Sequence, residues 1–276
     1  MQLISRFGRN SHSYRSPAPL TDDVLRTVAP SIFAEAAHGS RSDRYTYIPT
    51  SDVLRGLQKE GFSPFMVCQT RVRDESKREF TKHMVRMRHA SQINDGEANE
   101  VILLNSHDGT SSYQMLAGMF RFACSNGLVF GDTMADVRIR HKGQIVSSVI
   151  EGAYEVLQGF TRVREQRDAM RAIELEHVEA EIFARSALML KYDFDAATPV
   201  PVTERQVLAP RRTADMKSDL WSTFNRVQEN LVRGGMIGRN ARGRQQRTRE
   251  VQGIDQSVKI NRALWTLADE MRKLKS

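Results

Sequence analysis

The sequence from Phe65 to Leu104, FMVCQTRVRDESKREFTKHMVRMRHASQINDGEANEVILL, decides the fold class of this 276-residue chain. Segments 65–72, 82–88 and 100–104 are rich in strand-forming residues or alternate polar with apolar side chains. Such segments, when turn residues like those at 94–96 separate them, are typical of neighbouring strands in an antiparallel sheet. This stretch therefore predicts three strands of one sheet.

The pattern changes further along the chain. We expect two more strands, at 112–123 and 136–140. From Gly143 onwards, apolar residues recur at helical spacing up to Phe160 and again over 172–192, which predicts two helices covering one face of the sheet. The fold class is therefore α+β, with a mainly antiparallel sheet in the N-terminal half packed against helices and a helical C-terminal part.

Outside the sheet region, capping residues and prolines mark the remaining elements. Short helices are expected from Thr21 and over 50–60, and two longer ones over 219–232 and 255–273, where Trp221 and Trp265 should pack in the core. The predicted organisation is an N-terminal arm (1–40), an α+β core domain (41–192), a connector containing three prolines (193–212) and a helical C-terminal region (213–276) with a basic loop at 233–249.

Composition restricts the class of partner. The formal net charge of +8 attracts polyanions such as nucleic acid or acidic proteins. The sequence contains no apolar run long enough for a membrane span or a signal peptide, so we expect a cytoplasmic protein without a membrane partner. Cys68 and Cys124 each lack a CxxC partner, which favours buried free thiols.

The most informative composition lies between Glu229 and Glu250, where no acidic residue occurs. Guanidinium groups fork onto phosphate oxygens, so an Arg/Gly loop can bind a nucleic-acid backbone without reading bases. The alternative is a solvated linker with no ligand. The predicted nucleic-acid-binding residues of this segment are Arg233, Arg239, Arg242, Arg244, Arg247 and Arg249.

A second group of cations lies on a predicted strand. Alternation over 82–88 places Lys82, Arg86 and Arg88 on one face of that strand. These residues could form a cationic stripe that assists phosphate binding, or they could belong to an ordinary exposed sheet face. The pattern leaves both interpretations open.

Catalytic chemistry has weak support in this sequence. Cys124 could act as a nucleophile with His107 as base and Asp108 as its partner, but no family-type elbow surrounds Cys124, and turns at 108–109 and 126–127 explain the same residues. No HExxH motif or cysteine pair predicts a metal, and the glycines at 234–238 lack the lysine of a nucleotide phosphate loop. We therefore expect no metal, no cofactor and no enzymatic reaction.

Four motifs together resemble an uncharacterised phage- and plasmid-like family, domain of unknown function 932, with relatives in cryptic prophages of enteric bacteria. They are RSDRYTYIPT (41–50), LLNSHDGTSSYQM (103–115), RFACSNGLVFG (121–131) and HKGQIVSSVIEGAYEVL (141–157). The resemblance runs over nearly the whole chain and implies a mobile genetic element as context. It brings no catalytic residues with it.

Three functions follow, in order of preference. The first is a non-enzymatic nucleic-acid-binding protein of a prophage or plasmid, with DNA favoured over RNA, forming a homo-oligomer of the single-strand-binding or annealing type. The second is an anti-defence factor whose cationic surface binds a host protein complex. The third is a cysteine-dependent hydrolase.

Overall fold

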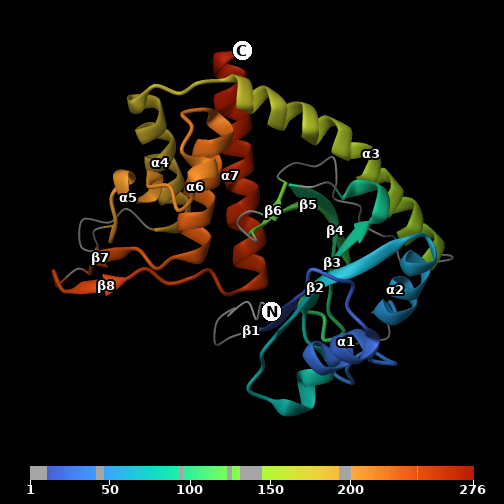
Figure 1. Cartoon of the computed structure of the whole chain (residues 1–276). Coiled ribbons are helices and arrows are strands. Elements are labelled where there is room, and N and C mark those ends of the chain that lie inside the picture. The colour runs from blue at the N-terminus through green and yellow to red at the C-terminus, as the bar shows by residue number, and fades with distance from the viewer. Residues whose placement is uncertain are drawn as a thin grey trace. The chain divides into compact units, whose positions relative to one another are not determined.

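The computed structural model describes residues 11–41, 47–93, 96–122, 126–130, 145–192, 200–240 and 242–276. The chain divides into two compact units, which Figure 1 draws in one colour gradient. The first unit comprises residues 1–128, 133–160 and 252–254, and the second comprises 129–132, 161–251 and 255–276. This division differs from the expected one, because the boundary runs through a long helix at 160–161 and residues 11–41 join the first unit.

The first unit contains a six-stranded sheet whose strands follow the order of the chain. This confirms the α+β class and the mainly antiparallel sheet. The edge strand β1 and the short strand β6 were not predicted, and the strand expected at 136–140 lies outside the described residues. The strands are β1 (Ser11–Arg15), β2 (Phe62–Thr70), β3 (His83–His89), β4 (Glu97–Asn105), β5 (Gln114–Arg121) and β6 (Asn126–Val129).

Both faces of this sheet are buried. On one face, Val67 pairs with Val85 and Val85 with Leu103, and none of the three side chains is more than 1% exposed. On the other face, Arg86 pairs with Ile102 and is only 3% exposed. Alternation along a strand assigns side chains to a face, but here neither face is open to solvent.

Helices of the first unit begin where the sequence predicted. Helix α1 (Asp22–Val28) starts at Thr21, whose hydroxyl accepts a hydrogen bond from the Val24 amide at 3.5 Å. Helix α2 (Thr50–Lys59) approaches the start of α3 (Ile145–Ala172) so closely that a Cβ on Gly56 would lie 2.7 Å from Val146. Three 3₁₀ turns, η1 (Pro30–Phe33), η2 (Glu75–Phe80) and η3 (Ala90–Gln92), also belong to this unit.

The second unit is built mainly from helices around a core of aromatic rings. Trp221 and Trp265 are 3% and 2% exposed, and both pack against Phe224, which confirms their predicted core position. One helix, α3, continues to Ala172 where a break near residue 160 was expected. The other elements of the second unit are α4 (His177–Lys191), α5 (Glu204–Leu208), η4 (Thr213–Asp215), α6 (Leu220–Arg233), β7 (Ile237–Arg239), β8 (Gln245–Arg247) and α7 (Ile254–Lys275). Across all of the described helices of the chain, none is both long and apolar enough to cross a membrane.

Candidate nucleic-acid interface

The Arg/Gly segment of the second unit forms an antiparallel hairpin, not the irregular loop that its composition indicated. Strands β7 and β8 pair through Ile237 with Arg247 and Arg239 with Gln245. At the tip, the side-chain oxygen of Asn240 accepts hydrogen bonds at 3.0 Å from the backbone amides of Arg242 and Arg244. Glycine at 243 has φ +72°, a conformation that other residues rarely adopt. These hydrogen bonds therefore hold residues 242–244 against Asn240.

One face of the hairpin packs against the protein and the other faces solvent. Gly238 lies on the packed face, where an added Cβ would come within 2.0 Å of the carbonyl oxygen of Pro201. The neighbouring amide of Arg239 donates to that same oxygen at 3.0 Å. Side chains alternate along a strand, so Arg239 and Arg247 point away from this contact, and both are exposed.

Four of the predicted arginines are exposed and make no ion pair within the described part of the chain. They are Arg242, Arg244, Arg247 and Arg249. A fifth, Arg239, is exposed and donates to the carbonyl oxygen of Gly243 at 3.0 Å. The structure thus brings five of the six predicted guanidinium groups onto one short hairpin, and none of the five forms an ion pair with a carboxylate in the described part of the chain.

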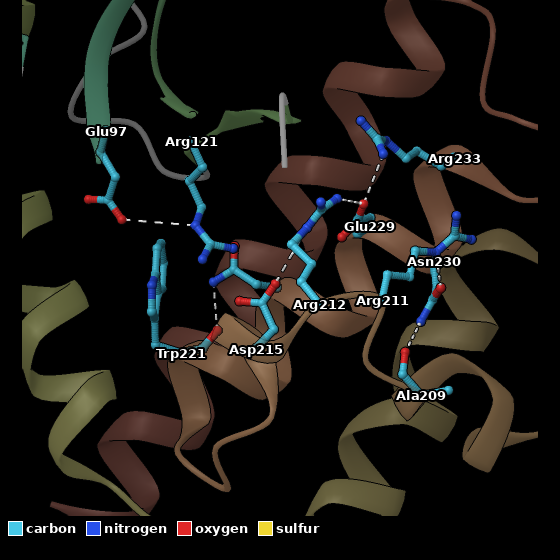
Figure 2. A network of polar contacts seen from close by, with 11 residues as sticks. Glu97, Arg121, Ala209, Arg211, Arg212, Asp215, Trp221, Glu229, Asn230 and Arg233 are labelled. Carbon is cyan, nitrogen blue, oxygen red and sulfur yellow. Dashed lines mark hydrogen bonds and ion pairs between the residues drawn. The ribbon is translucent and has the colours of Figure 1, made fainter. Parts of the chain in front are cut away.

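The sixth predicted arginine, Arg233, has a different environment. Its guanidinium lies 3.0 Å from the carboxylate of Glu229, one turn earlier on α6. Figure 2 shows Glu229 between Arg233 and Arg212, which also binds this carboxylate. Because Glu229 is only 2% exposed and needs these partners, Arg233 is a structural residue at the base of the hairpin.

A second set of polar contacts fixes the point where α6 ends and the hairpin begins (Figure 2). Arg211 donates from Nε to the side-chain oxygen of Asn230 at 2.6 Å and from its other end to the carbonyl of Gly234. The Asn230 amide donates in turn to the carbonyl of Ala209 at 2.9 Å. Sequence reasoning placed Arg211 in an irregular connector and missed this role, since the partners lie 19 to 23 residues away.

The two strands of the hairpin converge at Gly234. This residue has φ +64°, and a Cβ there would lie 2.6 Å from the carbonyl oxygen of Arg249. The Lys191 ammonium, at the end of α4, donates to that carbonyl oxygen at 2.9 Å. Burial lowers the pKa of Lys191 to about 8. These contacts hold the basic hairpin in a fixed position on α4 and α6.

The strand-borne cations require a correction. Arg86 and Arg88 are 3% and 2% exposed, and both bind the carboxylate of Glu100, at 2.5 Å and 2.9 Å. They therefore do not form an exposed stripe on the sheet. Their alternation correctly placed them on one face, but the sequence could not show that this face is covered. Lys82 is half-buried just before β3 begins.

The candidate catalytic residues do not form a charge-paired set in the described structure. His107 is fully buried, and within the described residues its ring makes no hydrogen bond to another side chain. The carboxylate of Asp108 instead accepts from the Thr110 amide at 3.0 Å and from its hydroxyl at 2.6 Å, in the expected turn beside Gly109. Cys124 lies outside the described residues. Cys68 is a buried free thiol, as predicted.

The described residues contain no group of three or more His, Cys, Asp or Glu side chains arranged to hold a metal ion.

Comparison with known proteins gives a consistent result over almost the full length. The family model described as "Domain of unknown function (DUF932)" matches residues 37–265. UPF0380 protein YfjQ and UPF0380 protein YafZ, both of Escherichia coli (strain K12), are each 54% identical to this chain over 270 residues. The alignments cover 98% of this chain and 97% of each relative. No solved structure matches it.

Proposed function

This chain belongs to the family of the domain of unknown function DUF932, as its motifs predicted, and we propose that it binds nucleic acid non-enzymatically through the basic hairpin. The observation that carries the proposal is the exposed set of five arginines without carboxylate partners on the described hairpin. The mobile-element setting, with DNA as the ligand, follows from the same family resemblance and forms part of the proposal.

The chemistry of the hairpin suits the sugar-phosphate backbone. Along an extended strand, side chains two residues apart project from one face about 7 Å apart, so Arg247 and Arg249 can contact successive phosphates. Between residues 237 and 249 the sequence has no aromatic side chain that could stack on a base. Binding should therefore be electrostatic and largely independent of base sequence.

The proposal rests on the hairpin alone. The sequence suggested that strand-borne arginines assist the loop, but Arg86 and Arg88 are buried against Glu100 and are removed from the interface. A hairpin with paired strands needs less ordering on binding than a free basic tail, because contacts at its base already hold it to the protein. This compensates in part for the smaller number of phosphate contacts.

The decisive experiment compares two fourfold variants. The hairpin variant replaces Arg242, Arg244, Arg247 and Arg249 by Gln. The control variant replaces four exposed cations of the first unit by Gln: Lys59, Arg73, Lys77 and Arg78. Both changes reduce the formal net charge of the full-length chain from +8 to +4, so they differ only in where the charge is removed.

Fluorescence anisotropy with labelled single- and double-stranded DNA and RNA measures the result. We expect the control to bind like the native protein and the hairpin variant to lose about tenfold or more in affinity at low salt. The slope of log K against log salt should also become shallower by about 0.7 to 0.9 for each lost phosphate contact. Equal losses in both variants, or no binding by the native protein at low salt, would refute the proposal.

A host protein with an acidic surface would complement the same hairpin. Purification from nuclease-treated lysate at high salt tests for it. If a stoichiometric protein stays bound and is lost only from the hairpin variant, the hairpin binds protein and the nucleic-acid proposal fails.

A further inference from the structure

A second group of arginines lies inside the first unit and is not part of the hairpin. Arg15 on β1, Arg86 and Arg88 on β3, and Glu100 on β4 are all buried, with exposed fractions of 8%, 3%, 2% and 0%. The pairing of Arg15 with Met66, and of Met66 with Arg86, places Arg15 and Arg86 on the same face of the sheet. Three guanidinium groups therefore lie on the face of the sheet that carries one buried carboxylate, Glu100.

That carboxylate is already occupied. Arg86 approaches Glu100 at 2.5 Å, and Arg88 donates to it from Nε at 2.9 Å. Arg86 also donates to the carbonyl oxygen of Leu128 at 2.5 Å. Arg86 Nε and Arg88 Nη2 lie within ion-pair distance of Glu100, although neither atom has a hydrogen-bond partner among the described residues. Glu100 forms no ion pair with Arg15 among the described contacts.

Arg15 is the unusual member of the group. Its Nε and Nη1 atoms are buried and have no hydrogen-bond partner in the described structure. Its guanidinium lies over the ring of Phe120, 4.4 Å from the centroid. Burial lowers the pKa of Arg15 to about 10, and Arg86 and Arg88 add repulsion, yet at neutral pH the group still carries its proton.

Counted over the described residues, the cluster therefore holds an excess of two positive charges. Three guanidinium groups against one carboxylate leave +2 in a region removed from water, where an uncompensated charge is strongly unfavourable. Buried charges in proteins are normally paired with a counter-charge or a ligand. An anion of about −2 would neutralise this group.

We propose that Arg15, Arg86 and Arg88 form a binding site for a phosphomonoester. Such a group carries about −1.5 to −2 at neutral pH and has three oxygens that accept from guanidinium forks, whereas a backbone phosphodiester carries −1. Two glycines keep the guanidinium groups close together. A Cβ at Gly127 would lie 2.0 Å from Nη1 of Arg86 and 3.2 Å from Nη2 of Arg15, and one at Gly118 would lie 2.7 Å from Nη2 of Arg86.

The site is independent of the proposed hairpin function. Phosphodiesters of a strand would contact the hairpin, while this cluster would hold a free nucleotide or the phosphorylated end of a strand. Inorganic phosphate is a suitable first probe because it carries a similar charge and its oxygens also accept from guanidinium forks.

The first test measures thermal unfolding in phosphate and in chloride at equal ionic strength. We expect phosphate to raise the Tm of the native protein saturably, by a few degrees at hundredfold excess over Kd. Arg15→Gln should abolish this rise and leave the Tm in chloride unchanged or higher, because it removes the uncompensated charge. Lys59→Gln, which removes one exposed charge of the first unit outside the cluster, should keep the full rise.

Two results would overturn the proposal. One is a native protein whose Tm does not respond to phosphate. The other is a folded Arg15→Gln protein that has a lower Tm in chloride but the full phosphate response, which would make Arg15 purely structural.

A second measurement decides the matter if Arg15→Gln does not fold. Nitrogen-15 labelling of arginine in the native protein gives separate Nε–H resonances, and Arg15→Lys assigns the signal of Arg15. Phosphate should shift that signal saturably, while the exposed hairpin arginines respond weakly and linearly. Absence of a saturable shift at Arg15 would refute the site.

The source of the phosphate group is tested in the fourfold hairpin variant, so that failure of hairpin binding cannot affect the result. The probes are a mononucleotide and one short single-stranded oligonucleotide with and without a 5′-phosphate. A Tm rise with the mononucleotide indicates a free nucleotide, and a rise with only the phosphorylated strand indicates a strand end. A rise with inorganic phosphate but with neither ester would contradict the phosphomonoester.

Discussion

Arg88 and Arg249 carry the same guanidinium group in opposite environments. Arg88 is buried, binds Glu100 and lies over the ring of Phe120 at 4.4 Å, so it belongs to the interior of the first unit. Arg249 is exposed and forms no ion pair in the described part of the chain. The difference arises from burial and from the nearest carboxylate, because a buried guanidinium needs an acceptor and an exposed one is solvated by water.

Two buried histidines should make the stability of the protein depend on pH. Burial lowers the pKa of His83 to about 3, with a further decrease from neighbouring His107, and burial lowers the pKa of His107 to about 4. In the unfolded chain both take up a proton near pH 6.5, whereas the folded protein excludes it. Their contribution to stability is thus complete above pH 6.5 and is lost as the pH falls towards 4.

His107→Phe tests this dependence, because phenylalanine keeps an aromatic ring at this buried position and cannot take up a proton. The native protein should lose on the order of 2–3 kcal/mol more stability than the variant between pH 7.5 and 4.5, measured by urea unfolding. His177→Gln, at an exposed site, is the control and should follow the native protein. Parallel curves for native protein and His107→Phe would contradict the assignment.

At the scale of elements, the basic hairpin is held in place mainly by its backbone. Gly238 packs on Pro201, Gly234 packs on Arg249, and Arg211 binds the carbonyl of Gly234. Backbone atoms cannot rotate away as a flexible side chain can, so these close approaches have little tolerance for an added carbon atom. The position of the arginines therefore depends on two glycines that have no side chain of their own to bind a phosphate.

Gly238→Ala should therefore release the hairpin from its support. An added methyl group in a packed contact costs about 1–3 kcal/mol, so local opening should become about tenfold more frequent. Trypsin cleavage after Arg242 and Arg244, followed by mass spectrometry, reports this opening. Gln246→Ala changes the exposed partner of Gly238 across the ladder and should cleave at the native rate. Equal cleavage of both variants would show that the Pro201 contact does not restrain the hairpin.

For the whole molecule, helix α3 links the two units along one continuous element. It contributes Val149 and Phe160 to the first unit and Met170 to the second, and all three are fully buried. Loss of structure in the first unit would remove the support of the helix that continues into the second. The two units should therefore unfold together, although each has its own core.

Glu100→Gln provides a test of this coupling. It leaves buried arginines without their counter-charge and should destabilise the first unit by about 3–5 kcal/mol. Trp221 and Trp265 both lie in the second unit, so their fluorescence reports that unit, while the reactivity of buried Cys68 reports the first. Both probes should shift to the same lower urea midpoint. A shift confined to the thiol probe would show that the units unfold separately.

Elements determined by local sequence agreed with the structure. Thr21 capped a helix, and the alternation over 82–88 marked a strand that the structure has at His83–His89. Elements that depend on a distant partner were missed. The edge strand β1 is short and forms through pairing with β2, more than fifty residues away, and the hairpin strands have three residues each in a segment rich in arginine and glycine.

By itself, the sequence determined the α+β class, the family and the presence of a segment in which no acidic residue offsets six arginines. Only the tertiary structure decided which arginines meet solvent and which meet Glu100, and that Arg233 belongs with Glu229. The physical reason is that periodicity and charge are local properties of a chain. Burial and counter-charge, in contrast, depend on residues from other strands and helices that come together only when the chain folds.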